Sequence, residues 1–209
     1  MGQPKMPKDG RTIQFSAVVA GSVVTNLIKW DLATGALTNL SAATGGQLDS
    51  DPRFTPDGQS VVFIDSYSRE NNDVGPGEVA LMDTTGQQRS IVTDDNLYDT
   101  DPDVGPEGGV VIARYLGEGP PSASDPDNPF QVTLEDFVLV RRDLDTGAES
   151  MLTNGEACYR LVPTLACLPV EGSSYLPNHT PDGQRVGYIT QLNSERTCVC
   201  TIGVDRSDS

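Results

Sequence analysis

The sequence predicts an all-β protein made of about four small antiparallel sheets, and two observations lead to this fold class. A Pro-Asp-Gly motif recurs along the chain, and each copy is followed by a short apolar run rich in β-branched residues. The composition also favours many short strands joined by turns, because 209 residues include 21 glycines and 15 prolines while 36% are hydrophobic.

The first repeated element is a tight turn between two antiparallel strands. Residues 49–58 and 99–108 align without a gap, and both lead into an apolar run. In this motif Pro fixes φ, the Asp carboxylate accepts a backbone N–H, and Gly tolerates a positive φ. The turn repeat consists of Asp9, Gly10, Pro56, Asp57, Gly58, Pro106, Glu107, Gly108, Pro181, Asp182 and Gly183.

A second marker closes the next strand pair in each repeat. It is an Asp followed closely by Thr-Gly, at residues 31–35, 83–86 and 143–147, and the fourth repeat has its counterpart at 201–205. Each marker follows another strand-like run, so one repeat contains four short strands in meander order. One four-stranded sheet per ~40 to 50 residues is the unit of a propeller blade.

We therefore expect residues 1–209 to form a single β-propeller domain or a fragment of one. The blade units cover about 1–45, 46–95, 96–155 and 172–209, with insertions at 117–130 and 155–174. The first unit lacks its first strand and the last unit lacks its final strand. The chain is then a fragment of a larger propeller, or an open form that self-associates through its exposed blade edges.

The repeat resembles that of TolB-type β-propellers, a WD-repeat-like family. The resemblance rests on Asp-x-x-Pro-x-Phe-Thr-Pro-Asp-Gly at residues 49–58, the Asp…Thr-Gly marker and a closing Leu-Thr at 152–153. The same repeat occurs in propeller portions of prolyl-oligopeptidase-like and tricorn-like peptidases and of pectate-fragment lyases. The resemblance implies six blades and a periplasmic or extracellular location, although this chain begins without the apolar segment of a signal peptide.

The sequence contains no recognisable catalytic constellation. Its single histidine, His179, stands where the repeat prefers an apolar residue, and we interpret it as a packed or hydrogen-bonded side chain near the axis. The alternative is a catalytic or metal-binding histidine.

We expect a non-catalytic interaction module that binds a protein or peptide through rim loops or the axial opening. The other reading is the propeller part of a larger prolyl-oligopeptidase-like or tricorn-like hydrolase, or of a lyase, whose catalytic region lies outside this chain.

Charge and hydropathy exclude several partners. The formal net charge of −16 disfavours nucleic acid, and no apolar stretch is long enough for membrane insertion. No cofactor is predicted, apart from Ca²⁺ as a weaker alternative at Asp99, Asp101 and Asp103, since clustered carboxylates suit this ion. Against calcium, Asp residues in such repeats commonly serve their own turns.

The four cysteines fall into two pairs with different geometry. Cys158 and Cys167 lie within one insertion, and we expect them to form a disulfide because members of the family often work outside the cytoplasm. The alternative is two thiols in a reducing compartment. Cys198 and Cys200 alternate on a predicted strand, so their side chains point to opposite faces and do not suit a bridge with each other.

Overall fold

The computed structural model describes residues 6, 10–18, 25–43, 48–68, 74–95, 97–116, 137–153, 156–159, 168–171, 173–193 and 196–204. Strands dominate this part of the chain, together with a short 3-10 helix η1 (Ser41–Ala43). No helix among the described residues has the length and apolar character needed to cross a membrane.

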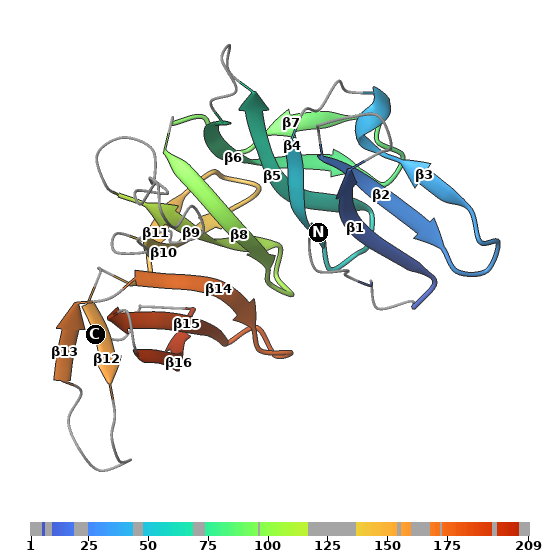
Figure 1. The fold of residues 1–209 in the computed structure, drawn as a ribbon. Helices are drawn as coiled ribbons and strands as arrows, with labels where there is room; N and C mark the ends of the chain where they lie inside the picture. The colour runs from blue at the N-terminus through green and yellow to red at the C-terminus, as the bar shows by residue number, and fades with distance from the viewer. Residues whose placement is uncertain are drawn as a thin grey trace.

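The strands form four successive antiparallel sheets, which we call the first to fourth blades. Their strands are β1 (Thr12–Val18), β2 (Thr25–Asp31) and β3 (Leu37–Asn39); β4 (Leu48–Phe54), β5 (Ser60–Ser68), β6 (Val74–Asp83) and β7 (Arg89–Ile91); β8 (Tyr98–Val104), β9 (Gly109–Tyr115), β10 (Phe137–Asp143) and β11 (Glu149–Met151); and β14 (Ser173–His179), β15 (Arg185–Asn193) and β16 (Arg196–Gly203). A single parallel pair, Thr25 with Leu48, links the first two sheets. The blades follow one another in an arc, and on its inner side β8 contacts both β4 and β14 (Figure 1). This is the predicted all-β, propeller-like architecture.

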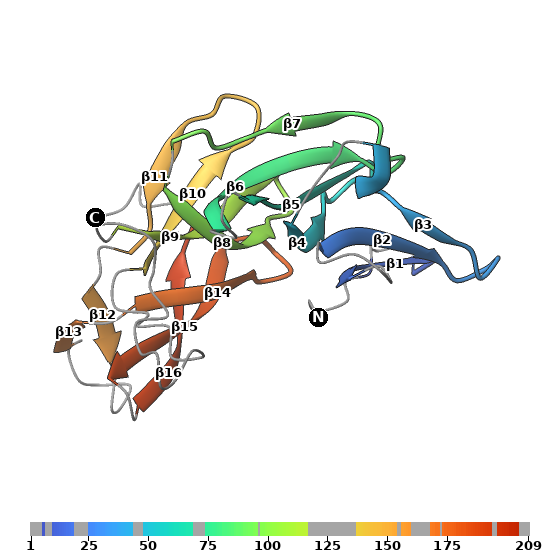
Figure 2. The same cartoon turned by 45° about the horizontal axis from the view of Figure 1, so that its top comes forward.

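Two details differ from the sequence-based expectation. Part of the 155–174 insertion forms a hairpin of β12 (Glu156–Tyr159) and β13 (Leu168–Glu171), visible beside the fourth blade in Figure 2. In the fourth blade, Gly203 pairs with Arg185 as Asp83 pairs with Ser60, so Gly203 and not Asp205 takes the marker position. The 117–130 insertion lies outside the described residues.

The hydrophobic core lies between blades. On β5, Val61 and Phe63 pack toward the first blade, while Val62 and Ile64 pack toward the third. Because alternate residues of a strand point to opposite faces, one strand feeds two separate cores. A third cluster, which includes Leu139 and Tyr188, joins the third and fourth blades. Face-to-face packing of neighbouring sheets therefore buries the apolar side chains.

The hairpin turns have the chemistry that the sequence predicts. Asp57 Oδ1 accepts hydrogen bonds from the Gln59 backbone N–H and the Thr55 hydroxyl, and Gly58 has a φ of 70°. The Gln59 and Thr55 bonds hold the pKa of Asp57 below its usual value. Asp182 makes the same bonds with Gln184 and Thr180.

Two glycines of the Thr-Gly turns have the same backbone conformation but differ in how closely neighbouring atoms approach them. Gly35 and Gly86 have φ values of 73° and 76°, but a Cβ on Gly86 would lie 2.3 Å from the Leu40 carbonyl oxygen whereas one on Gly35 meets nothing within 4 Å. We expect Gly35→Ala to lower the free energy of unfolding by about 1 kcal/mol, through the left-handed backbone alone. Gly86→Ala should cost at least about twice as much, because the Leu40 backbone cannot yield easily. Urea unfolding of both variants measures the difference, and equal losses would show that the contact between the first and second blades is looser than described.

Candidate binding site at the axis

The inner strands carry the same irregularity in three blades. Asp51, Asp101 and Leu176 have φ values of 50°, 48° and 51°, and each precedes a proline. At each of these places the register with the neighbouring strand shifts, which is a β-bulge. Three residues beyond each bulge, the chain reaches equivalent positions on β4, β8 and β14. The repeated bulge therefore determines which side chain of each inner strand points toward the interior of the arc.

These equivalent positions meet in one pocket. Phe54, Val104 and His179 line it together with Met6 from the N-terminal segment, and its volume is about 270 Å³. The other lining residues come from the ends of the inner strands and from the turns that follow them, and they are Arg53, Thr55, Pro56, Asp103, Pro106, Thr180 and Pro181. The lining is mainly apolar and prolyl, so the pocket suits an apolar group that arrives with a polar one.

A chain of polar contacts crosses three blades at the edge of this pocket. The His179 backbone N–H donates to Asp103 Oδ2 at 2.6 Å, and His179 Nδ1 lies 2.8 Å from the same oxygen. Arg53 Nε is 3.7 Å from Asp103 Oδ1. Gly105 seats the imidazole, since a Cβ there would lie 2.7 Å from His179 Nε2. The hydrogen-bonded interpretation of His179 is thus confirmed, and within the described residues its imidazole makes no hydrogen bond to a hydroxyl or thiol.

A second carboxylate near the axis has an unusual pKa. Burial raises the pKa of Asp101 to about 6, and the charge of Asp51 on the neighbouring blade adds to the effect, while Arg53 opposes it. The Leu176 backbone N–H donates to Asp101 and links the third blade to the fourth. Asp101 therefore acts as a contact between blades.

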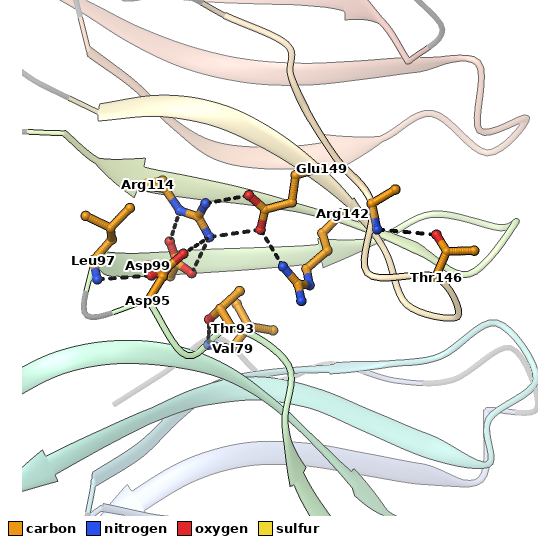
Figure 3. A network of polar contacts seen from close by, with 10 residues as sticks. Val79, Thr93, Asp95, Leu97, Asp99, Arg114, Arg142, Thr146 and Glu149 are labelled. Atoms are coloured by element: carbon orange, nitrogen blue, oxygen red, sulfur yellow. Dashed lines mark hydrogen bonds and ion pairs between the residues drawn. The ribbon is translucent and has the colours of Figure 1, made fainter.

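Hydroxyl groups link the outer strand of one blade to the next blade. Thr93 Oγ1 accepts the Val79 N–H at 2.8 Å within the second blade (Figure 3). The Thr93 side chain also hydrogen-bonds to Asp99 of the third blade. Ser41 does the same between Leu27 and Asp49 one blade earlier. We call these paired contacts the hydroxyl latches. The repeat pattern did not predict these latches, although an Asp lies several residues after Ser41 and Thr93 in the sequence.

Ion pairs surround each latch, and the strand that carries the arginine differs between the second and the third blade. In the third blade, Arg114 on β9 lies 2.7 Å from Asp99 and 2.8 Å from Glu149 on β11 (Figure 3). In the second blade the arginine is Arg89 on β7, which pairs with Asp49 and with Asp65 on β5. Asp49 and Asp99 thus both pair with an arginine of their own blade. The second strand carries an acid and the fourth an arginine in the second blade, whereas the third blade has the reverse.

The proposed calcium ligands do not gather in one place. Asp99 contacts Arg114, Asp103 contacts His179, and Asp101 lies near Asp51. Among the described residues, the group of three carboxylates whose oxygens all lie within 4.8 Å of one another is instead Glu78, Asp95 and Asp99. Calcium binding remains a prediction. The disulfide also remains one, because Cys167 lies outside the described residues and the β12–β13 register pairs Cys158 with Pro169.

Comparison with solved structures identifies the fold. TolB from Acinetobacter baumannii matches 98% of this chain with a TM-score of 0.63 at 19% sequence identity. The chain has the fold of a TolB-type β-propeller. A putative TolB from Agrobacterium tumefaciens matches 99% at a TM-score of 0.65 and 17% identity, and an oligogalacturonate lyase in complex with manganese matches 92% at 0.55 and 16%. No family model and no curated protein matches the sequence.

The chain spans only part of the length of the proteins whose TolB-type propeller fold it shares. The chain spans 41% of the Acinetobacter TolB, 59% of the Agrobacterium protein and 59% of the lyase. At sequence identities this low, the similarity extends to the fold alone. The pocket residues and the hydroxyl latches are therefore described from this chain alone.

The hydroxyl latch predicts a cost for removing one oxygen atom. We expect Thr93→Val to lower the free energy of unfolding by about 1–3 kcal/mol, because the buried Val79 N–H and the Asp99 carboxylate both lose a partner. The control is Thr38→Val, the same change at an exposed position on β3, which should cost less than about 0.5 kcal/mol. Urea unfolding compares the two variants, and equally small losses of unfolding free energy would show that the Thr93 hydroxyl does not stabilise the fold.

Asp101 predicts a pH dependence with a definite sign. Its folded pKa of about 6 lies above the ordinary 3.8, so its contribution to stability is present at low pH and is lost as pH rises through about 6. Asp101→Asn keeps an acceptor for Leu176 without the charge. Between pH 4.5 and 7.5, the variant should gain on the order of 2 kcal/mol relative to the wild type. Paired unfolding curves at both pH values test this, and a constant difference would contradict it.

Proposed function

We propose that this chain is a non-catalytic interaction module that binds a peptide segment of a protein partner at the axial pocket. The supporting observation is the convergence of Met6, Phe54, Val104 and His179, one residue from each repeat, on a single cavity. Concave, mostly apolar sites with a few polar groups are the usual places for ligands. A second surface for the partner is the rim, where the β12–β13 hairpin lies.

The lining indicates which part of a peptide would enter. Proline and Phe54 surfaces accept an aliphatic or prolyl side chain, and the cavity is too small for a folded domain. Arg53 is 8% exposed and its Nε has no hydrogen-bond acceptor, so a backbone carbonyl or carboxylate of the ligand would satisfy it. The ligand class is therefore an extended, apolar peptide segment with an acceptor near its buried residue.

The hydrogen bonds of the pocket's polar side chains support the non-catalytic proposal. His179 Nδ1 is held by Asp103, and the pocket's hydroxyls, Thr55 and Thr180, are bonded within their own turns. A hydrolytic site needs a nucleophile in contact with a base. The lining residues of this pocket supply binding groups without that contact.

The alternative is the propeller part of a larger hydrolase or lyase. It is favoured by the match to a prolyl endopeptidase structure, which covers 97% of this chain but 26% of that protein, with a TM-score of 0.62 and 12% identity. The reading frame around this segment distinguishes the two proposals. An adjoining α/β-hydrolase segment would support the enzyme and count against an independent binding module.

The resemblance to TolB also supports a periplasmic or extracellular location. A disulfide between Cys158 and Cys167 would agree with it, because such bonds persist in oxidising compartments. Mass spectrometry of a non-reducing digest tests the bridge directly.

Peptide selection tests the pocket. Peptides selected from a random display library on the intact chain should bind Met6→Arg at least about tenfold more weakly, because the new charge enters an apolar site. Met6 is 53% exposed, so the substitution should leave the fold intact. The matched control is Met151→Arg, at a position 45% exposed and outside the pocket lining, which should bind as the wild type does. Selected peptides that bind both variants equally would refute the pocket as the site.

A further inference from the structure

Two charged side chains at the axial pocket have hydrogen-bonding groups that the protein itself does not use. Arg53 on β4 and Asp103 on β8 both line the pocket, and their side chains are only 10% and 14% exposed. Within the described part of the chain, the Arg53 guanidinium donates from Nη1 to the Pro52 carbonyl at 3.1 Å, and its Nε donates to no acceptor. Both residues belong to the inner strands of the second and third blades, which have neighbouring blades on either side.

Asp103 offers the complementary acceptor. Its Oδ2 accepts the His179 backbone N–H at 2.6 Å and lies 2.8 Å from His179 Nδ1. Its Oδ1 is 3.7 Å from Arg53 Nε, which is beyond hydrogen-bond distance. Among the described residues, this oxygen therefore has a charged neighbour but no bonded donor. Because buried polar groups in proteins are nearly always hydrogen-bonded, the two side chains together suit a ligand group that both donates and accepts.

The charges around this pair disfavour a charged ligand group. A ligand carboxylate bound to Arg53 would lie beside Asp103, whose own carboxylate is 3.7 Å away. Asp101 is also near, since burial raises its pKa to about 6, the Asp51 charge adds to the rise and the Arg53 charge opposes it. Like charges this close cost free energy where water is scarce, and a ligand ammonium on Asp103 meets the same difficulty with Arg53. An uncharged group that donates to Asp103 and accepts from Arg53 avoids both costs.

The backbone of an extended peptide is such a group. In an antiparallel pair, one residue donates its N–H and accepts through its C=O toward the same neighbour. Any peptide that brings an apolar side chain between Phe54 and Val104 also brings these two backbone groups, which need partners once water leaves. Main-chain bonds then supply affinity, while the apolar lining selects the side chain.

We propose that Asp103 accepts the backbone N–H, and that Arg53 donates to the backbone C=O, of one residue of an extended peptide. The axial pocket then selects an uncharged internal segment and disfavours a charged chain terminus. This inference rests on the proposed function of the pocket, and it narrows the ligand's acceptor to a backbone carbonyl.

One substitution replaces the acceptor by a donor at this place. In Asp103→Asn, the His179 backbone N–H still needs an acceptor, so the amide oxygen takes the position of Oδ2 and the amide nitrogen that of Oδ1. The bond from the His179 backbone is kept, while the N–H of the ligand now meets another donor. The control is Asp145→Asn, which makes the same change of charge at an exposed turn position outside the pocket lining.

Ester scanning of a selected peptide provides the test. The probe is a display-selected peptide whose binding Met6→Arg weakens, synthesised with both termini capped and with one backbone amide at a time replaced by an ester, which removes that N–H. Calorimetric titration should show one ester that weakens binding to the wild type at least about tenfold, because a hydrogen bond to a charged group is lost. The same ester should cost less than about threefold in Asp103→Asn and keep its full cost in Asp145→Asn. Removing the caps should not strengthen binding.

The outcomes separate this inference from the proposed function. Peptides that bind Met6→Arg as well as the wild type, or no selected peptide at all, would refute the axial pocket as the site, and this inference with it. Peptides that need the pocket but tolerate every ester, that require a free terminus, or that depend instead on a side-chain amide would overturn this inference alone. An equal ester cost in the wild type and in Asp103→Asn would do the same. Circular dichroism checks that Asp103→Asn folds, and the ester series on the wild type decides the matter if it does not.

Discussion

Packing of one small sheet against the next is the interaction on which the rest of this structure depends. Each interior strand sends alternate side chains into two cores, as β5 does with Phe63 on one side and Ile64 on the other. Hydroxyl latches such as Thr93 add directional bonds to this non-directional burial, and buried polar groups need such partners. Stability is thereby shared between neighbours, as in other repeat proteins.

The same arrangement creates the axial pocket. Repeated bulges at Asp51, Asp101 and Leu176 bring equivalent residues of different blades to one point, although these residues are far apart in the sequence. Chemical variety then comes from differences between repeats: Phe54 and Val104 are apolar, and His179 is polar. A polar residue can occupy this position because Asp103 and Gly105 of the adjacent blade accommodate the imidazole.

Much of the fold was predictable because the turns are local. Pro-Asp-Gly encodes its own hydrogen bonds within a few residues, so Asp57 and Asp182 behave as their sequence indicates. The ion pairs inside the blades were harder to foresee, since Asp99 pairs with Arg114 on β9 whereas Asp49 pairs with Arg89 on β7. The β12–β13 hairpin lacks the repeat signal altogether. Of the candidate site, the axial place of His179 was predictable, but its partner Asp103 was instead assigned to calcium.

Native-state hydrogen exchange tests the central claim most directly. The backbone N–H groups of Leu27, Val79 and Leu139 donate to the hydroxyls of Ser41, Thr93 and Thr153 beside the contacts between blades. If the blades stabilise one another, these amides should exchange only through global unfolding, with the same opening free energy as the centre of β5. Exchange of these amides at markedly lower free energy, blade by blade, would show that the sheets open independently and would contradict the account.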